Sequence, residues 1–291
     1  MNPYKWHYGN YNVQYYFLNY LQNREFSALR SKGRNAFACA NMRNMRVHNI
    51  QGFKFFMEFL RMFDIGKDYN MYYSMAKFRN GIPERNLKNN DWEKEKFEEW
   101  NENCHNDIIG YDMLIDIDAG EHDNIDYAVD SAKRIRNRLN HLNVPYQLRF
   151  SGMGFHFIIP SRYFVPELIE SDRVDNFNPH KDGNVYQDMM KIAQYLYDVD
   201  SEMIDKDLFD SRRLAKLPYS LSIYDDAVFV CKPVNPDELD YFKIEKYLLI
   251  NNKMPVLDAD TIYNPDGNVF KLIEAVNGKE KNSRRRKAKD C

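Results

Sequence analysis

The feature that most constrains the fold is the alternation, from Tyr111 onward, of short apolar runs with segments of helical spacing. This alternation is typical of a mixed α and β domain built around one sheet, so we expect an α/β (α+β) fold. Strands are predicted at MLIDID (113–118), at 145–150, after the glycine-containing turn of SGMGFHFIIP (151–160) and at 227–230. Helices are predicted after an N-cap at Asp123 or Asn124, over 185–197 and over 238–250.

The charge balance restricts the classes of function. The chain has 41 Lys+Arg against 43 Asp+Glu, a net charge of -2. A function that needs a strongly charged surface overall is excluded, and any nucleic-acid site has to be local. No apolar run approaches the roughly 18 residues of a membrane span, and the first ten residues have no signal-peptide pattern. We therefore expect no membrane association and a cytoplasmic, intracellular protein.

The cysteines point to a reducing compartment. They lie far apart without a C-x-x-C pair, which fits neither a disulfide framework nor a four-cysteine zinc site. We expect free thiols and no structural zinc, and we expect the lone Cys104-His105 pair to be structural. The four residues are Cys39, Cys104, Cys231 and Cys291.

The remaining segments predict two lobes and a tail. Apolar residues at helical spacing in Gln51–Phe63 predict a helix with one buried face. The charged, Asn-rich stretch 82–107 predicts an exposed loop and an amphipathic helix that uses Trp92, Phe97 and Trp100. This stretch would join lobes covering about 1–105 and 106–278. The basic end, 279–291, lacks apolar residues, so we expect disorder, with a nucleic-acid contact as the alternative.

Two carboxylates lie at the end of the predicted MLIDID strand. Strand side chains repeat every second residue, so Asp116 and Asp118 point to the same side. Adjacent carboxylates repel unless a cation neutralises them, and hard oxygen ligands suit Mg²⁺ or Mn²⁺. The alternative is an acidic strand end with no ligand, because a D-x-D motif is short.

The SGMGFHF segment predicts a glycine-containing turn between strands. Its glycines, Gly152 and Gly154, allow backbone N–H groups to approach an anion, and Ser151 and His156 add side-chain donors. Phosphate is the natural ligand. The alternative is a tight hairpin turn whose histidine only packs.

The segment IDKDLFDSRRLAKLPYS combines acids and bases. Three carboxylates precede a basic cluster, as a site for a metal and a triphosphate would require. The alternative is a loop with surface ion pairs. Asp205 follows the apolar pair Met203-Ile204, which predicts a strand end beside MLIDID. We therefore favour it as the third metal ligand, with Asp207 next and Asp210 as an ion-pair partner of Arg212 and Arg213.

Taken together, these segments resemble the archaeo-eukaryotic primases, in particular their small catalytic subunits. The resemblance rests on DID (116–118), SGMGFH (151–156) and the segment 204–220, with REF (24–26) and YYSMAKF (72–78) upstream. It spans most of residues 15 to 250. It implies a primase catalytic domain over 1–278, with an RRM-like catalytic sheet joined to an N-terminal α/β lobe.

The resemblance also implies an activity and its residues. The activity is template-directed nucleotidyl transfer, primer synthesis on single-stranded DNA by a DNA primase or primase-polymerase. Two Mg²⁺ or Mn²⁺ ions and nucleoside triphosphates take part. The near-neutral net charge predicts modest affinity for the template, which leaves room for an accessory or large primase subunit that helps to grip the DNA. The implied metal ligands are Asp116, Asp118 and Asp205, and the implied nucleotide-binding residues are Ser151, Gly152, His156, Arg213 and Lys216.

This sequence departs from the family pattern at two places. Met153 and Gly154 stand where cellular primases often carry adjacent arginines, and SLS ends in Ser222 where the family commonly has histidine. Two alternatives remain. One is a primase-fold polymerase for end joining or repair synthesis, and the other is a non-catalytic nucleic-acid-binding protein.

Overall fold

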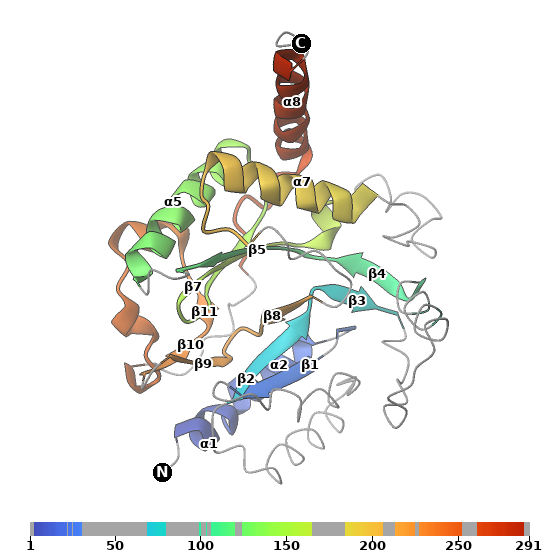
Figure 1. Ribbon diagram of the computed structural model, residues 1–291. Helices are drawn as coiled ribbons and strands as arrows, with labels where there is room; N and C mark the ends of the chain where they lie inside the picture. The colour runs from blue at the N-terminus through green and yellow to red at the C-terminus, as the bar shows by residue number, and fades with distance from the viewer. Residues whose placement is uncertain are drawn as a thin grey trace.

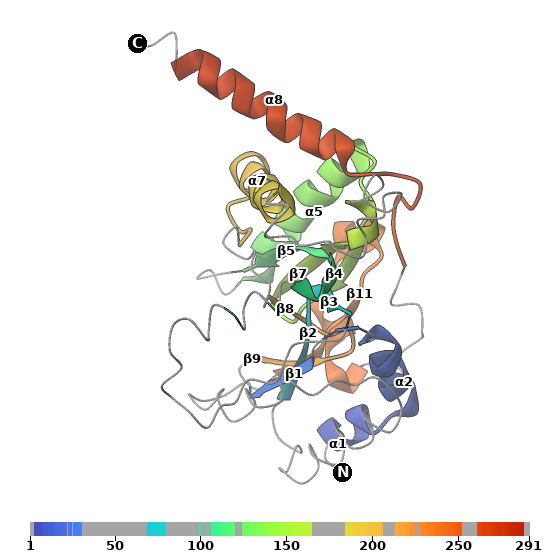
Figure 2. The same cartoon turned by 90° about the vertical axis from the view of Figure 1, so that its right-hand side faces the viewer.

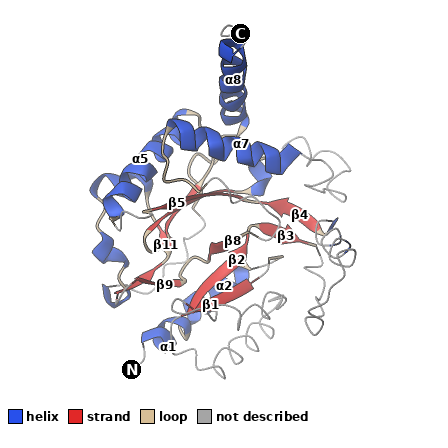
Figure 3. Ribbon diagram, viewed as in Figure 1, coloured by secondary structure: helices blue, strands red, loops and turns tan. Residues whose placement is uncertain are grey.

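The described part of the computed structural model comprises residues 3–21, 23–24, 26–30, 69–79, 99, 103, 106–119, 124–164, 184–205, 213–224, 227–251 and 261–287. Within it the fold mixes helices with small antiparallel sheets (Figures 1 and 3), which confirms the α/β (α+β) class. The helix predicted over Gln51–Phe63 and the aromatic residues Trp92, Phe97 and Trp100 lie outside the described residues. So does the Cys104-His105 pair.

The central sheet has four antiparallel strands in the order β11-β6-β7-β5. β5 (Met113–Asp118) is the predicted MLIDID strand, and it pairs along its whole length with β7 (Gly154–Ile159). β6 (Gln147–Phe150) lies on the other side of β7, and β11 (Lys232–Pro233) follows at the edge. Two of the three strand predictions in this region are thus confirmed in place, and the strand predicted at 145–150 begins two residues later.

Helices α5 (Ile125–His141) and α7 (Asn184–Val199) lie on one side of this sheet (Figure 1). The side chain of Asn124 caps α5 by accepting a hydrogen bond from the Asp126 amide at 2.9 Å. Apolar residues three and four apart give α5 one buried face, which contacts β5 and β7. They include Val129, Ala132, Ile135 and Leu139. Both helix predictions are confirmed.

The C-terminal helix differs from the expectation of a disordered tail. α8 (Phe270–Lys287) contacts α7 and continues as a helix to Lys287 at the outside of the molecule (Figure 2). Lys, Arg and Glu are good helix formers, and extending a helix costs less than starting one. A charged segment therefore continues the helix begun by the apolar residues before it.

The prediction of a helix over 238–250 is wrong. This stretch forms three short 3-10 helices, Pro236–Tyr241, Ile244–Tyr247 and Leu249–Asn251. The backbone becomes extended at Phe242, with ψ 135°. As a result the rings of Phe242 and Tyr247 stack at 5.2 Å and both pack on Phe150, whereas residues five apart on an α-helix would diverge.

Strands from distant parts of the chain form a second, three-stranded sheet in the order β1-β2-β8. β1 (Phe26–Arg30) and β2 (Tyr69–Ser74) come from the N-terminal part, but β8 (Leu214–Lys216) comes from the predicted catalytic lobe. Helices α1 (Pro3–Tyr8) and α2 (Tyr11–Tyr20) lie beside this sheet. The remaining elements are β3 (Ala76–Phe78), β4 (Ile108–Tyr111), the 3-10 helix Ser161–Tyr163, β9 (Leu221–Tyr224) and β10 (Ala227–Val230).

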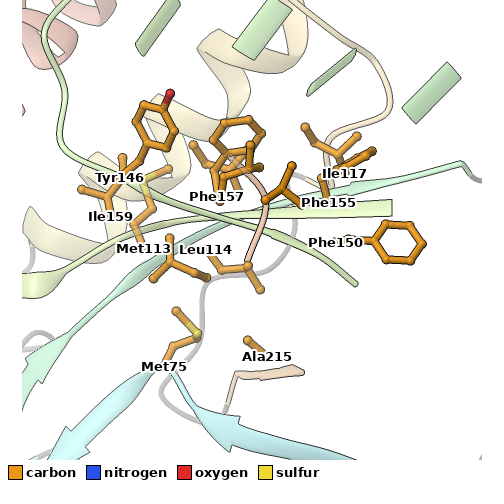
Figure 4. Packing of buried hydrophobic residues seen from close by; sticks show 14 of the residues in the cluster. Met75, Met113, Leu114, Ile117, Tyr146, Phe150, Phe155, Phe157, Ile159 and Ala215 are labelled. Atoms are coloured by element: carbon orange, nitrogen blue, oxygen red, sulfur yellow. The ribbon is translucent and has the colours of Figure 1, made fainter. Parts of the chain in front are cut away.

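One apolar cluster joins the two sheets. Figure 4 shows Met75 and Ala215, from the β2 and β8 side, on the side of β5 toward which Leu114 points. Leu114 lies on the same face of β5 as Asp116, because alternate strand residues share a face. The polar residues of that face are therefore directed toward β2 and β8. Among the described residues, no helix is long and apolar enough to cross a membrane.

The chain returns to β5 after α7. Ile204 forms an isolated antiparallel bridge with Ile117, so residues around 204 extend the sheet by a minimal strand beside β5. The order along the chain is therefore β5, α5, β6, β7, α7 and this bridge. The prediction that Met203-Ile204 fixes a strand end beside MLIDID is confirmed.

Candidate active site

Three polar residues lie opposite one another across neighbouring strands, and we call Asp205, Asp116 and His156 the site row. Asp116 of β5 and His156 of β7 are direct partners in the strand register. On the other side of β5, the Asp205 amide donates to the Asp116 carbonyl at 3.1 Å, which places Asp205 opposite Asp116. Residues directly opposite in an antiparallel sheet have side chains on the same face. Backbone pairing thus brings together residues far apart in sequence.

Cationic and polar side chains surround Asp116. The Nε2 atom of His156 lies 3.4 Å from its Oδ1 atom, and Arg213 Nη2 donates to its Oδ2 atom at 3.4 Å. Burial alone would raise the pKa of the Asp116 carboxyl, but His156, Arg213 and Lys216 together hold it below its ordinary value. Asp116 is therefore ionised at neutral pH and attracts cations.

Lys216 connects the other two motifs to this row. Its Nζ atom donates to the Ser151 carbonyl at 2.6 Å and to Ser222 Oγ at 2.8 Å. Burial lowers the pKa of Lys216, against the opposing effect of neighbours that include Asp116 and Asp118. The ammonium thus lies between the glycine turn and β9, next to Ser222.

The glycine turn fits tightly against its surroundings. Gly152 has φ 121°, a conformation that side-chain-bearing residues rarely adopt, and a Cβ atom there would lie 2.2 Å from Ser222 Oγ. A Cβ atom on Gly154 would lie 1.9 Å from the Ile117 carbonyl oxygen. Only glycine at 154 allows β7 to approach β5 beside Asp118. Close neighbours on both sides, Ser222 and Ile117, therefore leave no room for a side chain at Gly152 or Gly154.

The predicted site residues converge to different degrees. Asp116, Asp205, His156, Arg213 and Lys216 form one cluster through the contacts above, and Ser151 joins it through its carbonyl. Asp118 is exposed at the end of β5, opposite Gly154, on the same face as Asp116. Three residues considered in the sequence, Asp207, Asp210 and Arg212, lie outside the described residues.

The cluster suits a divalent cation in its donor chemistry. The described residues contain no group of three or more His, Cys, Asp or Glu side chains already arranged to hold a metal ion. However, one Arg213 nitrogen lies 3.4 Å from Asp116 Oδ2 and 3.8 Å from Asp205 Oδ2, so a cation already fits between these carboxylates. Two carboxylates that share one cation are the donor set that Mg²⁺ or Mn²⁺ prefers.

The sequence interpretation missed a buried arginine next to the site row. Arg149 of β6 is the strand partner of His156, and it is fully buried. Its guanidinium donates to the hydroxyls of Tyr73 and Tyr20 and to the side-chain carbonyl of Gln147. The signal was the alternation of the polar residues Gln147 and Arg149 along β6, which places both on the face of His156.

A buried ion pair between Arg24 and Asp112 connects the two sheets and was also missed. Arg24, in the REF segment, pairs with Asp112, which lies 3.4 Å from Lys77 Nζ and accepts the Ser161 amide at 2.8 Å. Burial would raise the pKa of Asp112, but these partners, Arg24 first, lower it to about 2. Arg24 also lies 5.0 Å from the centre of the Tyr73 ring. Asp112 and Arg149 thus hold β2, and through it β8, against the central sheet.

Comparison with known proteins adds no assignment: no protein-family model matches this chain, and no curated protein matches it. The geometry of the site therefore carries the functional argument.

Proposed function

We propose that this protein is a template-directed nucleotidyltransferase of the archaeo-eukaryotic primase type, a DNA primase or primase-polymerase. The observation that carries the proposal is the site row, in which Asp116 and Asp205 lie side by side with His156, Arg213 and Lys216 around them. Acidic oxygens for metals next to cations for a triphosphate are what phosphoryl transfer requires.

The topology supports the same proposal. The order β5, α5, β6, β7, α7 and the Ile117–Ile204 bridge corresponds to the βαββαβ arrangement of an RRM-like sheet. The carboxylates lie on the face of this sheet directed away from α5 and α7. In the archaeo-eukaryotic primases, which this sequence resembles, this sheet carries the metal and nucleotide ligands. Here β2 and β8 would belong to the N-terminal lobe that covers them.

Each residue has a role in the proposed reaction. Bound Mg²⁺ or Mn²⁺ would supply activation of the attacking 3′-hydroxyl and neutralisation of the charge on pyrophosphate. Asp116, Asp118 and Asp205 would hold these ions. The ammonium of Lys216 and the guanidinium of Arg213 would bind the triphosphate oxygens, with Ser151, the Gly152 backbone and His156 completing the phosphate site.

The near-neutral net charge of -2 bears on the partners. Few phosphate contacts give modest affinity for single-stranded DNA, and what affinity there is falls with salt. We therefore propose that an accessory or large primase subunit helps to grip the template.

The test is an unprimed synthesis assay on single-stranded DNA with ribonucleotides or deoxyribonucleotides and Mg²⁺ or Mn²⁺. We expect oligonucleotide products from the wild type and none from Asp116→Asn or Asp205→Asn. Asp130→Asn, on the exposed face of α5, is the matched control and should retain activity. Extension of a supplied primer without unprimed products would favour the end-joining or repair polymerase. DNA binding without any metal-dependent incorporation would overturn the proposal in favour of the non-catalytic protein.

A further inference from the structure

Arg213 occupies the position between the two carboxylates of the site row. Its Nη2 atom lies 3.4 Å from Asp116 Oδ2 and 3.8 Å from Asp205 Oδ2. The Arg213 carbonyl accepts a hydrogen bond from the Met75 amide at 2.9 Å, so the backbone is fixed on the β2 side. The guanidinium acts here as an internal counter-ion for Asp116 and Asp205.

The hydrogen-bond donors of this guanidinium are incompletely satisfied. The Arg213 Nε atom is buried, and among the described residues it has no hydrogen-bond partner. About 29% of the side chain is nevertheless exposed. A buried donor without an acceptor is costly, so the two carboxylates hold the group in a position that other contacts do not favour. A side chain with one open side and a fixed backbone can turn away from the carboxylates.

We propose that Arg213 and a divalent cation compete for Asp116 and Asp205, and that the metal displaces Arg213 toward the nucleotide triphosphate. This inference rests on the proposed function. Mg²⁺ and Mn²⁺ bind carboxylate oxygens directly at about 2.1 Å, so the metal and the guanidinium cannot share the Asp116 Oδ2 atom without strong repulsion. The released guanidinium then has a new anion within reach, because a triphosphate must bind beside the same metal. The loading of metal and the availability of Arg213 for nucleotide are thereby coupled.

This exchange predicts effects of opposite sign for one substitution. Arg213→Gln removes the competing charge, so Mn²⁺ binding in the absence of nucleotide becomes tighter. The same change removes a triphosphate ligand, so nucleotide binding at saturating Mn²⁺ becomes weaker. If Arg213 only ordered the carboxylates, metal binding would weaken, and if it only bound phosphate, metal binding would not change.

The experiment is a titration of the full chain with Mn²⁺ alone, followed through the electron paramagnetic resonance signal of free Mn²⁺. We expect Arg213→Gln to bind Mn²⁺ about threefold to tenfold more tightly than the wild type, the range set by ion pairs of this exposure. Arg213→Lys keeps the charge and should lie closer to the wild type. Arg162→Gln is the matched control, because this exposed arginine follows the opposite end of β7 from Gly154.

A second titration uses a nucleoside triphosphate with a non-cleavable α,β linkage at saturating Mn²⁺. Here Arg213→Gln should bind the nucleotide at least about fivefold more weakly. Mn²⁺ affinity that is unchanged or reduced in folded Arg213→Gln overturns the competition. Tighter Mn²⁺ binding with unchanged nucleotide affinity overturns the transfer of Arg213 to the triphosphate. Wild-type Mn²⁺ binding no stronger than that of Asp116→Asn would instead remove the metal site itself, and the proposed function with it.

Discussion

His156 and Asp116 are direct partners across β7 and β5, with the imidazole Nε2 atom 3.4 Å from the carboxylate Oδ1 atom. The His156 side chain is almost fully buried, and among the described residues its Nδ1 atom has no hydrogen-bond partner. The sequence suggested a phosphate ligand at this position. The structure adds a contact that orients one of the proposed metal ligands.

His156→Ala should therefore affect both metal and nucleotide. We expect a raised KM for nucleotide and Mn²⁺ affinity lowered by about tenfold, the usual effect of losing a group that orients a metal ligand. Steady-state kinetics and Mn²⁺ titration measure the two effects. A folded variant with wild-type Mn²⁺ affinity would limit His156 to phosphate.

Asp116→Asn should abolish incorporation, with a loss on the order of 10²-fold or more, because a metal ligand loses its charge. Asn at position 116 relieves the repulsion between Asp116 and Asp118, but it also loses the attraction between Asp116 and the cations around it. We therefore expect a slightly lower melting temperature. The pKa of Asp116 is lowered, so its stabilising contribution is present above about pH 4 and lost as pH falls through the folded pKa. Thermal unfolding of both proteins from pH 7 to pH 2 should show the difference vanish. A variant that is more stable than the wild type at pH 7 would contradict this electrostatic interpretation.

Asp112→Asn tests the buried ion pair that holds the sheets together. Loss of the carboxylate leaves Arg24 buried without its counter-ion, so we expect destabilisation of about 3–5 kcal/mol. The pKa of Asp112 is lowered to about 2, so the stability of the wild type should fall as pH decreases from about 4 to about 2, and the variant should lack this part of the decline. Urea unfolding at a series of pH values measures both quantities. Equal pH profiles would show that Asp112 does not control acid stability.

Gly152→Ala should destabilise the glycine turn for two separable reasons. The φ of 121° costs about 1–3 kcal/mol for a residue with a side chain, and the new Cβ atom clashes with Ser222. Ser222→Gly removes the Ser222 atoms that would clash, so the double variant should recover part of the stability but not all of it. Chemical unfolding of the two single variants and the double variant provides the cycle. If the stability changes of the two single variants simply add in the double variant, the destabilisation by Gly152→Ala does not come from a clash with Ser222.

Lys216→Met separates nucleotide binding from stability. Burial lowers the pKa of Lys216, so the charged ammonium destabilises the native state at neutral pH, and this cost declines as pH rises through the folded pKa. Removing the charge offsets the loss of its hydrogen bonds to Ser151 and Ser222, and we expect a change within about 1 kcal/mol. The KM for nucleotide should rise by about tenfold or more. A large loss of stability with normal nucleotide binding would make Lys216 a structural residue.

Local patterns predicted the elements nearest the site. Asn124 and the apolar spacing of α5, the alternation in MLIDID and the glycines before His156 are all short-range signals, and each element forms where they predict it. The position of Asp205 beside β5 could also be predicted from the sequence, because an apolar pair precedes it.

Side-chain contacts between residues far apart in the sequence could not be predicted from such local patterns. Nothing in the sequence near Arg24 identifies Asp112 as its partner, and nothing near Arg149 identifies Tyr20 and Tyr73. The stretch 236–251 failed for a related reason: its apolar residues have helical spacing, but packing on Phe150 overrides it.

The approach of Gly154 to the Ile117 carbonyl oxygen limits which residues this position can tolerate. The obstacle to any other residue is main chain rather than a side chain, so no second substitution nearby can make room for it. At Gly152, by contrast, the obstacle is the Ser222 side chain, which a second substitution can remove, so glycine at 154 is the stricter requirement of this sheet. Any chain that pairs β7 with β5 in this register therefore needs glycine two residues before the histidine that faces Asp116.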